Sequence, residues 1–148
     1  MMIHVREAQA GDAPHVVRLI ADLARADSEN SPITERYVNQ YLSASGSCLL
    51  VAEVEGQVVG LLSYSVRLNL FHGADSGLIE ELIVAEDRRG GGIGSALLSE
   101  TLRRLESMGC AEVSVSTMPD NEGARRFYRS HGLVDEAVFV EKHFTRTP

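Results

Sequence analysis

A glycine-rich stretch preceded by two arginines, EDRRGGGIGSALL at residues 86–98, carries the clearest chemical signal in the sequence. An apolar helical pattern follows it at once, and the start of a helix presents unpartnered backbone N–H groups and a partial positive charge. Glycine lets an anion approach the backbone without meeting a Cβ atom, and Arg88 and Arg89 would add charge-assisted hydrogen bonds. The stretch therefore predicts a binding site for phosphate, most naturally a pyrophosphate.

Two common phosphate motifs do not fit this stretch. A Walker loop ends in Gly-Lys-Ser/Thr, whereas residues 94–96 read GSA and contain no lysine. A dinucleotide fingerprint reads G-x-G-x-x-G, whereas residues 92–97 read GIGSAL and lack the third glycine. The acidic residue that binds a ribose is also missing, because the next expected strand, at 111–117, ends in hydroxyl side chains. A nucleotide-binding protein that uses this loop for another pyrophosphate is thus an alternative with little support.

The elements that would position the loop mix strands and helices along the whole chain. Asp12 and Thr34 precede two helical patterns, and the turn at residues 55–56 joins two strands as a hairpin. The glycine stretch opens a third helix, and residues 119–133 form a fourth. Alternating or continuous apolar runs predict the strands, which are expected at 3–8, 47–54, 57–66, 77–85, 111–117 and in one or two pieces of 134–144. This pattern predicts an α/β fold: a mixed, mostly antiparallel sheet of six or seven strands flanked by about four helices.

Two motifs together resemble a known family. The pattern Arg89-x-x-Gly92-x-Gly94 after a strand reading EELIV resembles the acetyl-coenzyme A loop of the GNAT superfamily of N-acetyltransferases. Residues 79–98 are similar to the family's central strand, loop and helix. Residues 119–133, PDNEGARRFYRSHGL, are similar to its second motif, with Asn, Ala, Phe-Tyr and Gly in the family's places. The order of elements resembles the family over nearly the whole chain, which implies one acetyltransferase domain over residues 1–148.

The resemblance implies a site for acetyl-coenzyme A as co-substrate. Backbone amides of the loop would hold its pyrophosphate, and the pantetheine arm would lie along the preceding strand like an added strand. One departure is Gly91, where the family often has a polar or basic side chain. The implied coenzyme-binding residues are Leu82, Ile83, Val84, Arg89, Gly90, Gly91, Gly92, Ile93, Gly94, Ser95, Asn121 and Tyr128.

The same resemblance implies the catalytic groups. Tyr128 stands where the family places its general acid, and a phenol is a suitable proton donor to a departing thiolate. The acceptor amine arrives protonated, so a carboxylate must take its proton directly or through water. Glu80 matches a glutamate of polyamine-type acetyltransferases, and Glu81 is the alternative; strand alternation predicts that the two lie on opposite faces. Asn121 is expected to cap the following helix, with a contact to the pantetheine arm as a second possible role.

The implied reaction is transfer of the acetyl group of acetyl-coenzyme A to a primary amine, by direct attack in a ternary complex. Acidic residues in the segments that form the family's acceptor site favour a small cationic amine: Asp22, Asp27, Glu29, Glu35 and Asp75. A peptide or protein N-terminus, a lysine side chain or a non-catalytic acyl-coenzyme A sensor remain alternatives. The apolar tail at 138–144, VFVEKHF, predicts a homodimer, because many GNAT proteins pair through their C-terminal strands.

The composition narrows the class of protein. The net charge of −7 argues against nucleic-acid binding, and no apolar run reaches the roughly 20 residues of a membrane span. Cys48 and Cys110 fit buried structural thiols in a reducing compartment, and the start of the chain does not resemble a secretory signal, so we expect a cytoplasmic protein. No metal is expected, because the histidines are scattered without ligand spacing: His4, His15, His72, His131 and His143.

Overall fold

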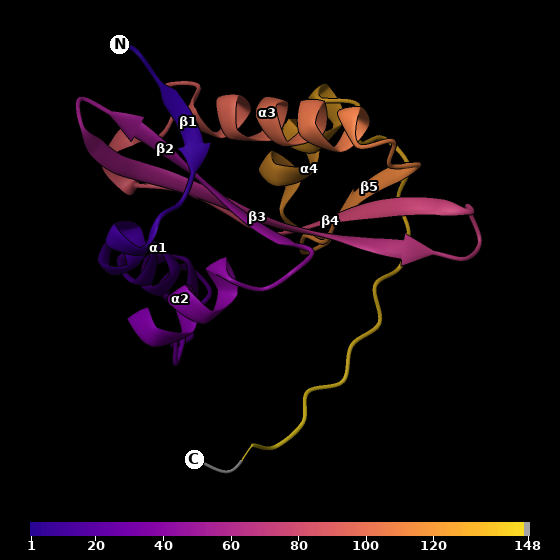
Figure 1. Ribbon diagram of the computed structural model, residues 1–148, viewed down its shortest axis with the longest axis horizontal. Helices are drawn as coiled ribbons and strands as arrows, with labels where there is room; N and C mark the ends of the chain where they lie inside the picture. The colour runs from indigo at the N-terminus through magenta and orange to yellow at the C-terminus, as the bar shows by residue number, and fades with distance from the viewer. Residues whose placement is uncertain (147–148) are drawn as a thin grey trace. The chain divides into compact units, whose positions relative to one another are not determined.

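The computed structural model of the 148-residue chain describes residues 1–146, which group into two compact units (Figure 1). The first unit, Met1–Val115, holds the sheet and three α-helices. The second unit begins at Ser116 and holds one α-helix, α4 (Glu122–Ser130).

The first unit is built on one five-stranded sheet in the order β1-β2-β3-β4-β5. The pairs β1–β2, β2–β3 and β3–β4 are antiparallel, and β4–β5 is parallel, so the sheet is mixed. The β2–β3 turn has positive φ at Glu55 and Gly56, as the hairpin prediction requires. The strands are β1 (His4–Glu7), β2 (Ser47–Val54), β3 (Gln57–Asn69), β4 (Ala74–Val84) and β5 (Glu112–Val115).

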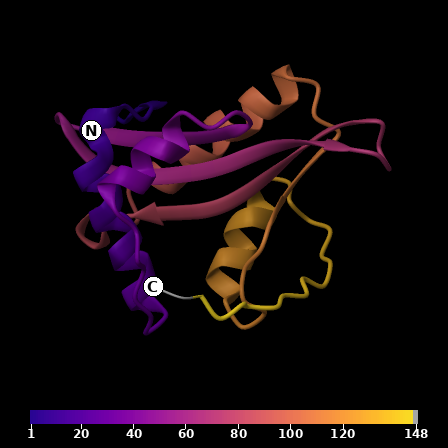
Figure 2. The same ribbon diagram turned by 60° about the horizontal axis from the view of Figure 1, so that its bottom comes forward.

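Two helices cover one face of this sheet, and Figures 1 and 2 show them side by side. They are α1 (Ala13–Ala26), with Pro14 in its first turn, and α2 (Glu35–Leu42), whose N-cap Thr34 accepts a hydrogen bond from the Tyr37 amide. Their apolar sides meet the strands in one core cluster made of Ala13, Val16, Leu19, Val38, Leu49, Val51, Val58, Leu61 and Ile83. Leu61 and Ile83 therefore identify the face of β3 and β4 that looks toward α1 and α2.

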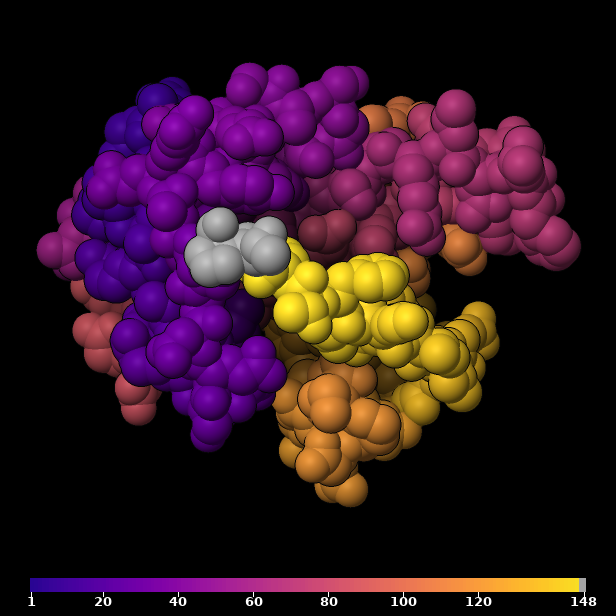
Figure 3. Space-filling model, turned by 90° about the horizontal axis from the view of Figure 1, so that it is seen from below, coloured from indigo at the N-terminus to yellow at the C-terminus, as the bar shows by residue number. Residues whose placement is uncertain are grey.

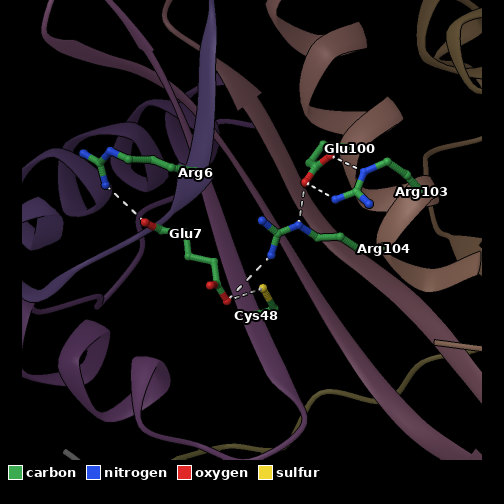
Figure 4. A network of polar contacts seen from close by, with 6 residues as sticks. All are labelled: Arg6, Glu7, Cys48, Glu100, Arg103 and Arg104. Carbon is green, nitrogen blue, oxygen red and sulfur yellow. Dashed lines mark hydrogen bonds and ion pairs between the residues drawn. The ribbon is translucent and has the colours of Figure 1, made fainter. Parts of the chain in front are cut away.

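The third helix, α3 (Ile93–Ser107), covers the opposite face. It packs so closely that a Cβ atom on Gly77 of β4 would lie 2.6 Å from Leu105 Cδ1. Ion pairs add to this packing: Arg104 contacts both Glu100 on α3 and Glu7 on β1, whose carboxylate also accepts from the Cys48 thiol (Figure 4). The sequence places α3 directly after the glycine loop, so this packing also fixes the position of the loop's helical end.

The predicted number of strands is wrong: the described residues form five strands, and the tail adds none to the sheet. The apolar tail pattern has the alternation of a strand, but a strand also needs a ladder partner. Within residues 134–146 no ladder forms, and Val138, Phe139, Val140 and Phe144 are exposed. The tail is instead tied to α4 through Glu136, which accepts hydrogen bonds from Arg125 and Arg129.

Candidate functional site

The glycine loop between β4 and α3 has a backbone that only glycine adopts easily. Gly90 and Gly92 have φ of 81° and 85°, in the left-handed region, and Gly92 is the N-cap residue of α3. The first turn of α3 has no side-chain cap and no acidic residue, so neither competes with an anion for its N–H groups. This 15-residue helix therefore offers an anion site formed by the amides of Ile93, Gly94 and Ser95.

Arg89 and Arg88, which precede this loop, have different surroundings. The Nε of Arg89 donates to the carbonyl of Val84 at 3.2 Å, which fixes the guanidinium at the end of β4 and leaves its other nitrogens for a ligand. Arg88 is instead part of the wall of a hollow of about 650 Å³ beside α1, together with His15 and Arg18. Of the two arginines, Arg89 is thus the one attached to the strand that leads into the loop.

One edge of β4 is open over its last residues. The parallel pairing with β5 covers only Ser76–Ile79 of β4, so among the described residues no strand pairs with Glu80–Val84 on that side. Glu81–Val84 remain paired with β3 on their other edge. An open edge offers backbone N–H and C=O groups to an extended ligand, which can add to the sheet as a further strand would. A single 3-10 turn, η2 (Glu86–Arg88), connects the end of this edge to the glycine loop.

A β-bulge interrupts β4 at the point where this open edge begins. Ser63 of β3 lies opposite Glu81 and Tyr64 opposite Ile79, so Glu80 is the extra residue of β4. The Glu81 amide donates to the Ser63 hydroxyl at 3.0 Å. A bulge turns two successive residues toward one side, so the predicted placement of Glu80 and Glu81 on opposite faces is wrong.

Tyr41 of α2 shows which face the two glutamates share. Its hydroxyl donates to the carbonyls of Cys48 and Tyr64, at 3.3 and 3.4 Å. Burial, and then the charges of Glu80 and Glu81, raise the pKa of Tyr41 to about 12. The register gives the same face, because Glu81 lies opposite Ser63, which alternates with Leu61 of the α1–α2 core. Glu80 follows Ile79, which lies on the other face, so the Glu80 side chain also lies on the α2 side. Burial and the neighbouring Glu80 charge also raise the pKa of Glu81, while Glu80 is exposed. The α2 side of the bulge thus combines two carboxylates and a neutral phenol.

The second unit supplies the two remaining predicted residues. Asn121 is the N-cap of α4, and its Oδ1 accepts from the Ala124 amide at 3.0 Å, so the predicted cap is confirmed. Tyr128 is half-buried and packs edge-to-face against Phe127, with ring centroids 5.3 Å apart. Burial raises the pKa of Tyr128. A phenol in this state keeps its proton near neutral pH, as a general acid must.

Sequence reasoning missed Tyr41 and Ser63 as parts of the site. The only signal in the sequence was the pair of adjacent glutamates in an otherwise apolar strand, because a bulge is invisible to strand alternation. The acidic residues that favoured a cationic acceptor are spread over several segments; Asp22, for example, pairs with Arg25 on α1. Within residues 1–146 no group of His, Cys, Asp and Glu gathers as a metal site. No helix in that range has the length and apolar character needed to cross a bilayer.

Comparison with known proteins agrees with this geometry. The model of the acetyltransferase (GNAT) family matches residues 16–133. An aminoalkylphosphonate N-acetyltransferase of Salmonella typhimurium is 27% identical over 97% of this chain and 88% of its own length. A thialysine N-epsilon-acetyltransferase of Bos taurus is 28% identical over 90% of this chain and 85% of its own length. The crystal structure of a transcriptional regulator from Bacillus halodurans superimposes with a TM-score of 0.86 at 27% identity, over 97% of this chain and all of the other.

Proposed function

The chain belongs to the acetyltransferase (GNAT) family, and from this premise we propose that it transfers the acetyl group of acetyl-coenzyme A to a small primary amine. The relatives named above are N-acetyltransferases that act on amines, which supports the same class of reaction here. We propose direct attack of the amine on the thioester while both substrates are bound. The observation that carries the proposal is the open β4 edge, which runs straight into an uncapped helix start flanked by Arg89.

The coenzyme would bind by its two polar parts. The amides of residues 90–95 and the guanidinium of Arg89 suit the pyrophosphate, because all of them donate hydrogen bonds to an anion. Residues 89–95 also contain no acidic side chain that would compete with the phosphates. The amides of the pantetheine arm suit the open backbone at Leu82, Ile83 and Val84. The thioester would then lie near the bulge, because the arm runs from the loop back along β4 toward Glu80.

The proton of the attacking ammonium would leave through the carboxylates at the bulge. Glu80 is our first candidate for the base, because it is exposed where an incoming amine can meet it. Glu81 is the alternative, because burial raises its pKa and so makes it a stronger proton acceptor than an ordinary carboxylate. Tyr128 would return a proton to the departing thiolate, and Asn121, besides capping α4, would contact the pantetheine arm.

The acceptor that we favour is a small amine that arrives as an ammonium cation. Two carboxyl groups and the Tyr41 oxygen offer such a cation several acceptor oxygens on the α2 side of β4. A peptide or protein N-terminus and a lysine side chain are the alternative acceptors. A non-catalytic acyl-coenzyme A sensor would keep the loop and the open edge but would not need the carboxylate pair or Tyr128.

The test is the release of free coenzyme A thiol from acetyl-coenzyme A across an acceptor panel. The panel holds polyamines, amino acids, aminoalkyl acids, lysine analogues, aminoglycosides and peptides with free N-termini. We expect one class to respond, and we expect Tyr128→Phe to lower kcat at least tenfold with unchanged coenzyme affinity. Phe127→Leu, on the same helix, is the matched packing control. Tight binding of acetyl-coenzyme A with no thiol release for any acceptor would instead favour the sensor.

Three further expectations belong to this proposal. Both units would act as one acetyltransferase domain, because the family match runs from the first unit into the second. The protein would be cytoplasmic. It would also be a homodimer, because the exposed apolar side chains of the tail at 138–144 offer a surface to a second copy. Sedimentation that shows only a 16.1 kDa species at micromolar concentration would reject the dimer.

A further inference from the structure

We propose that the acceptor amine also carries an acidic group, and that Arg67 of β3 binds this group. This inference rests on the proposed acetyl transfer and specifies its substrate class: an aminoalkyl acid, with a carboxylate or phosphonate a few bonds from the amine.

Arg67 lies on the same face of the sheet as Glu81. Leu61 of β3 points into the core cluster under α1 and α2, and alternate residues of a strand share a face. No β3 residue is inserted between Leu61 and Arg67, since the extra residue at the bulge belongs to β4. Ser63, Ser65 and Arg67 therefore continue the face of Leu61 toward the β3–β4 turn. Glu81 is directly across from Ser63 at the other end of this polar row.

The charge of Arg67 is not used elsewhere in the described structure. Within residues 1–146 its guanidinium makes no hydrogen bond or ion pair, and the residue is exposed. Arg6 of β1, by contrast, pairs with Asp12 and Glu53. Figure 3 shows this side of the first unit, with α1 and α2 and, beyond α2, the tip of the β3–β4 hairpin.

A buried hydroxyl beside Arg67 also lacks a partner. Ser76 of β4 is directly opposite Arg67 in the β3–β4 register, so the two residues share a face. Its side chain is 1% exposed, and its Oγ has no hydrogen-bond partner among the described residues. A buried hydroxyl without a partner is costly, and a polar ligand atom or its bound water beside Arg67 would supply the missing bond. The exposed cation and the unpartnered hydroxyl thus belong to one cross-strand pair of residues.

The spacing suits a short acceptor. Ser63 and Arg67 are four residues apart on β3, about 13 Å at the usual rise of a strand. The side chains of Arg67 and of the glutamates each cover part of this span. The gap that remains fits an amine joined to an acid by a few carbon atoms, with the ammonium at Glu80 and Glu81 and the acid at the guanidinium, which binds carboxylate and phosphonate oxygens in pairs. A diamine of the same length would place its second cation against Arg67.

The experiment compares three acceptors of one carbon chain: aminopropylphosphonate, propylamine and diaminopropane. With the unaltered protein we expect the KM for aminopropylphosphonate to be at least tenfold below that for propylamine, and diaminopropane to be the poorest. Arg67→Gln should raise the KM for aminopropylphosphonate about tenfold or more, with little change in its kcat and none in the KM for propylamine. Arg67→Lys should restore part of the loss, because it keeps the charge without the paired donors. Arg103→Gln, which removes an exposed arginine of α3 on the opposite face, is the matched control.

Several outcomes would overturn the inference. One is a wild-type preference for diaminopropane, and another is an equal KM change for propylamine and aminopropylphosphonate in Arg67→Gln. Calorimetric titration of aminopropylphosphonate into the protein with coenzyme A separates this inference from the proposed function, because it needs no turnover. Binding that Arg67→Gln abolishes, without any thiol release, would keep the anion site and reject acetyl transfer. Thiol release from propylamine, with no binding preference for the phosphonate, would support acetyl transfer and reject the anion site at Arg67.

Discussion

Replacing Gly92 by alanine tests the proposed pyrophosphate loop most directly. Gly92 has φ of 85° and ψ of 7°, and a Cβ atom built there meets nothing within 4 Å. The cost of Gly92→Ala is therefore backbone strain alone, about 1–2 kcal/mol for an L-residue in the left-handed region. For a domain of this size that loss lowers Tm by several degrees, at about 2–4 °C per kcal/mol.

The neighbouring glycine provides the matched control. Gly91 lies outside the left-handed region, and its added Cβ would come 3.1 Å from the flexible end of Met1. Gly91→Ala should therefore change the free energy of unfolding by only a few tenths of a kcal/mol, as at ordinary surface sites. The two variants add the same methyl group to the same loop, so any difference between them comes from the backbone conformation.

The assay combines unfolding in urea with calorimetric titration of coenzyme A. Gly92→Ala should relieve its strain by moving the loop, and one misplaced amide donor to a phosphate weakens binding by about tenfold or more. Gly91→Ala should bind coenzyme A as the parent does. Equal effects of the two substitutions on both stability and affinity would show that the left-handed start of α3 does not hold the coenzyme.

Three other substitutions test the bulge and the packing behind it. Glu80→Gln should move the pH–rate profile to alkaline pH, where the free amine needs no base; an unmoved profile would transfer the role to Glu81 or to water. Glu81→Gln should raise Tm at neutral pH and leave it unchanged at about pH 4. Because burial raises the pKa of Glu81, the folded state tolerates the protonated carboxyl but loses stability as the pH rises through the folded-state pKa and the group ionises. Glutamine stays neutral and so avoids this loss. A Tm gain that is the same at both pH values would contradict the buried-carboxylate explanation. Gly77→Ala should cost about 1–3 kcal/mol, because its Cβ would overlap Leu105, and a double variant with Leu105→Ala should recover part of the loss in urea unfolding.

The sequence predicted best those features that depend on a few neighbouring residues, such as helix caps and tight turns. Thr34 and Asn121 cap helices as expected, and the hairpin at Glu55 and Gly56 follows from its turn residues. The family was identified from two motifs, and the match over residues 16–133 confirms it. The tail was misjudged because alternation says nothing about whether a strand has a partner. In the described residues Glu136 pairs with Arg125 of α4, and no ladder forms.

The bulge at Glu80 could not be predicted, yet it explains two features of the candidate site at once. The β5 pairing ends at Ile79, and the extra residue follows immediately, so the same irregularity marks where the edge of β4 opens. It also puts Glu80 and Glu81 together on the α2 face, which a regular strand would give to only one of them. A coenzyme on the open edge and an amine on the α2 face would therefore meet at Glu80. Deleting Glu80 should restore a regular β3–β4 register and leave Glu81 as the one glutamate on the α2 face. We expect this deletion to weaken coenzyme binding along the altered edge as well as turnover, whereas Glu80→Gln should impair turnover alone.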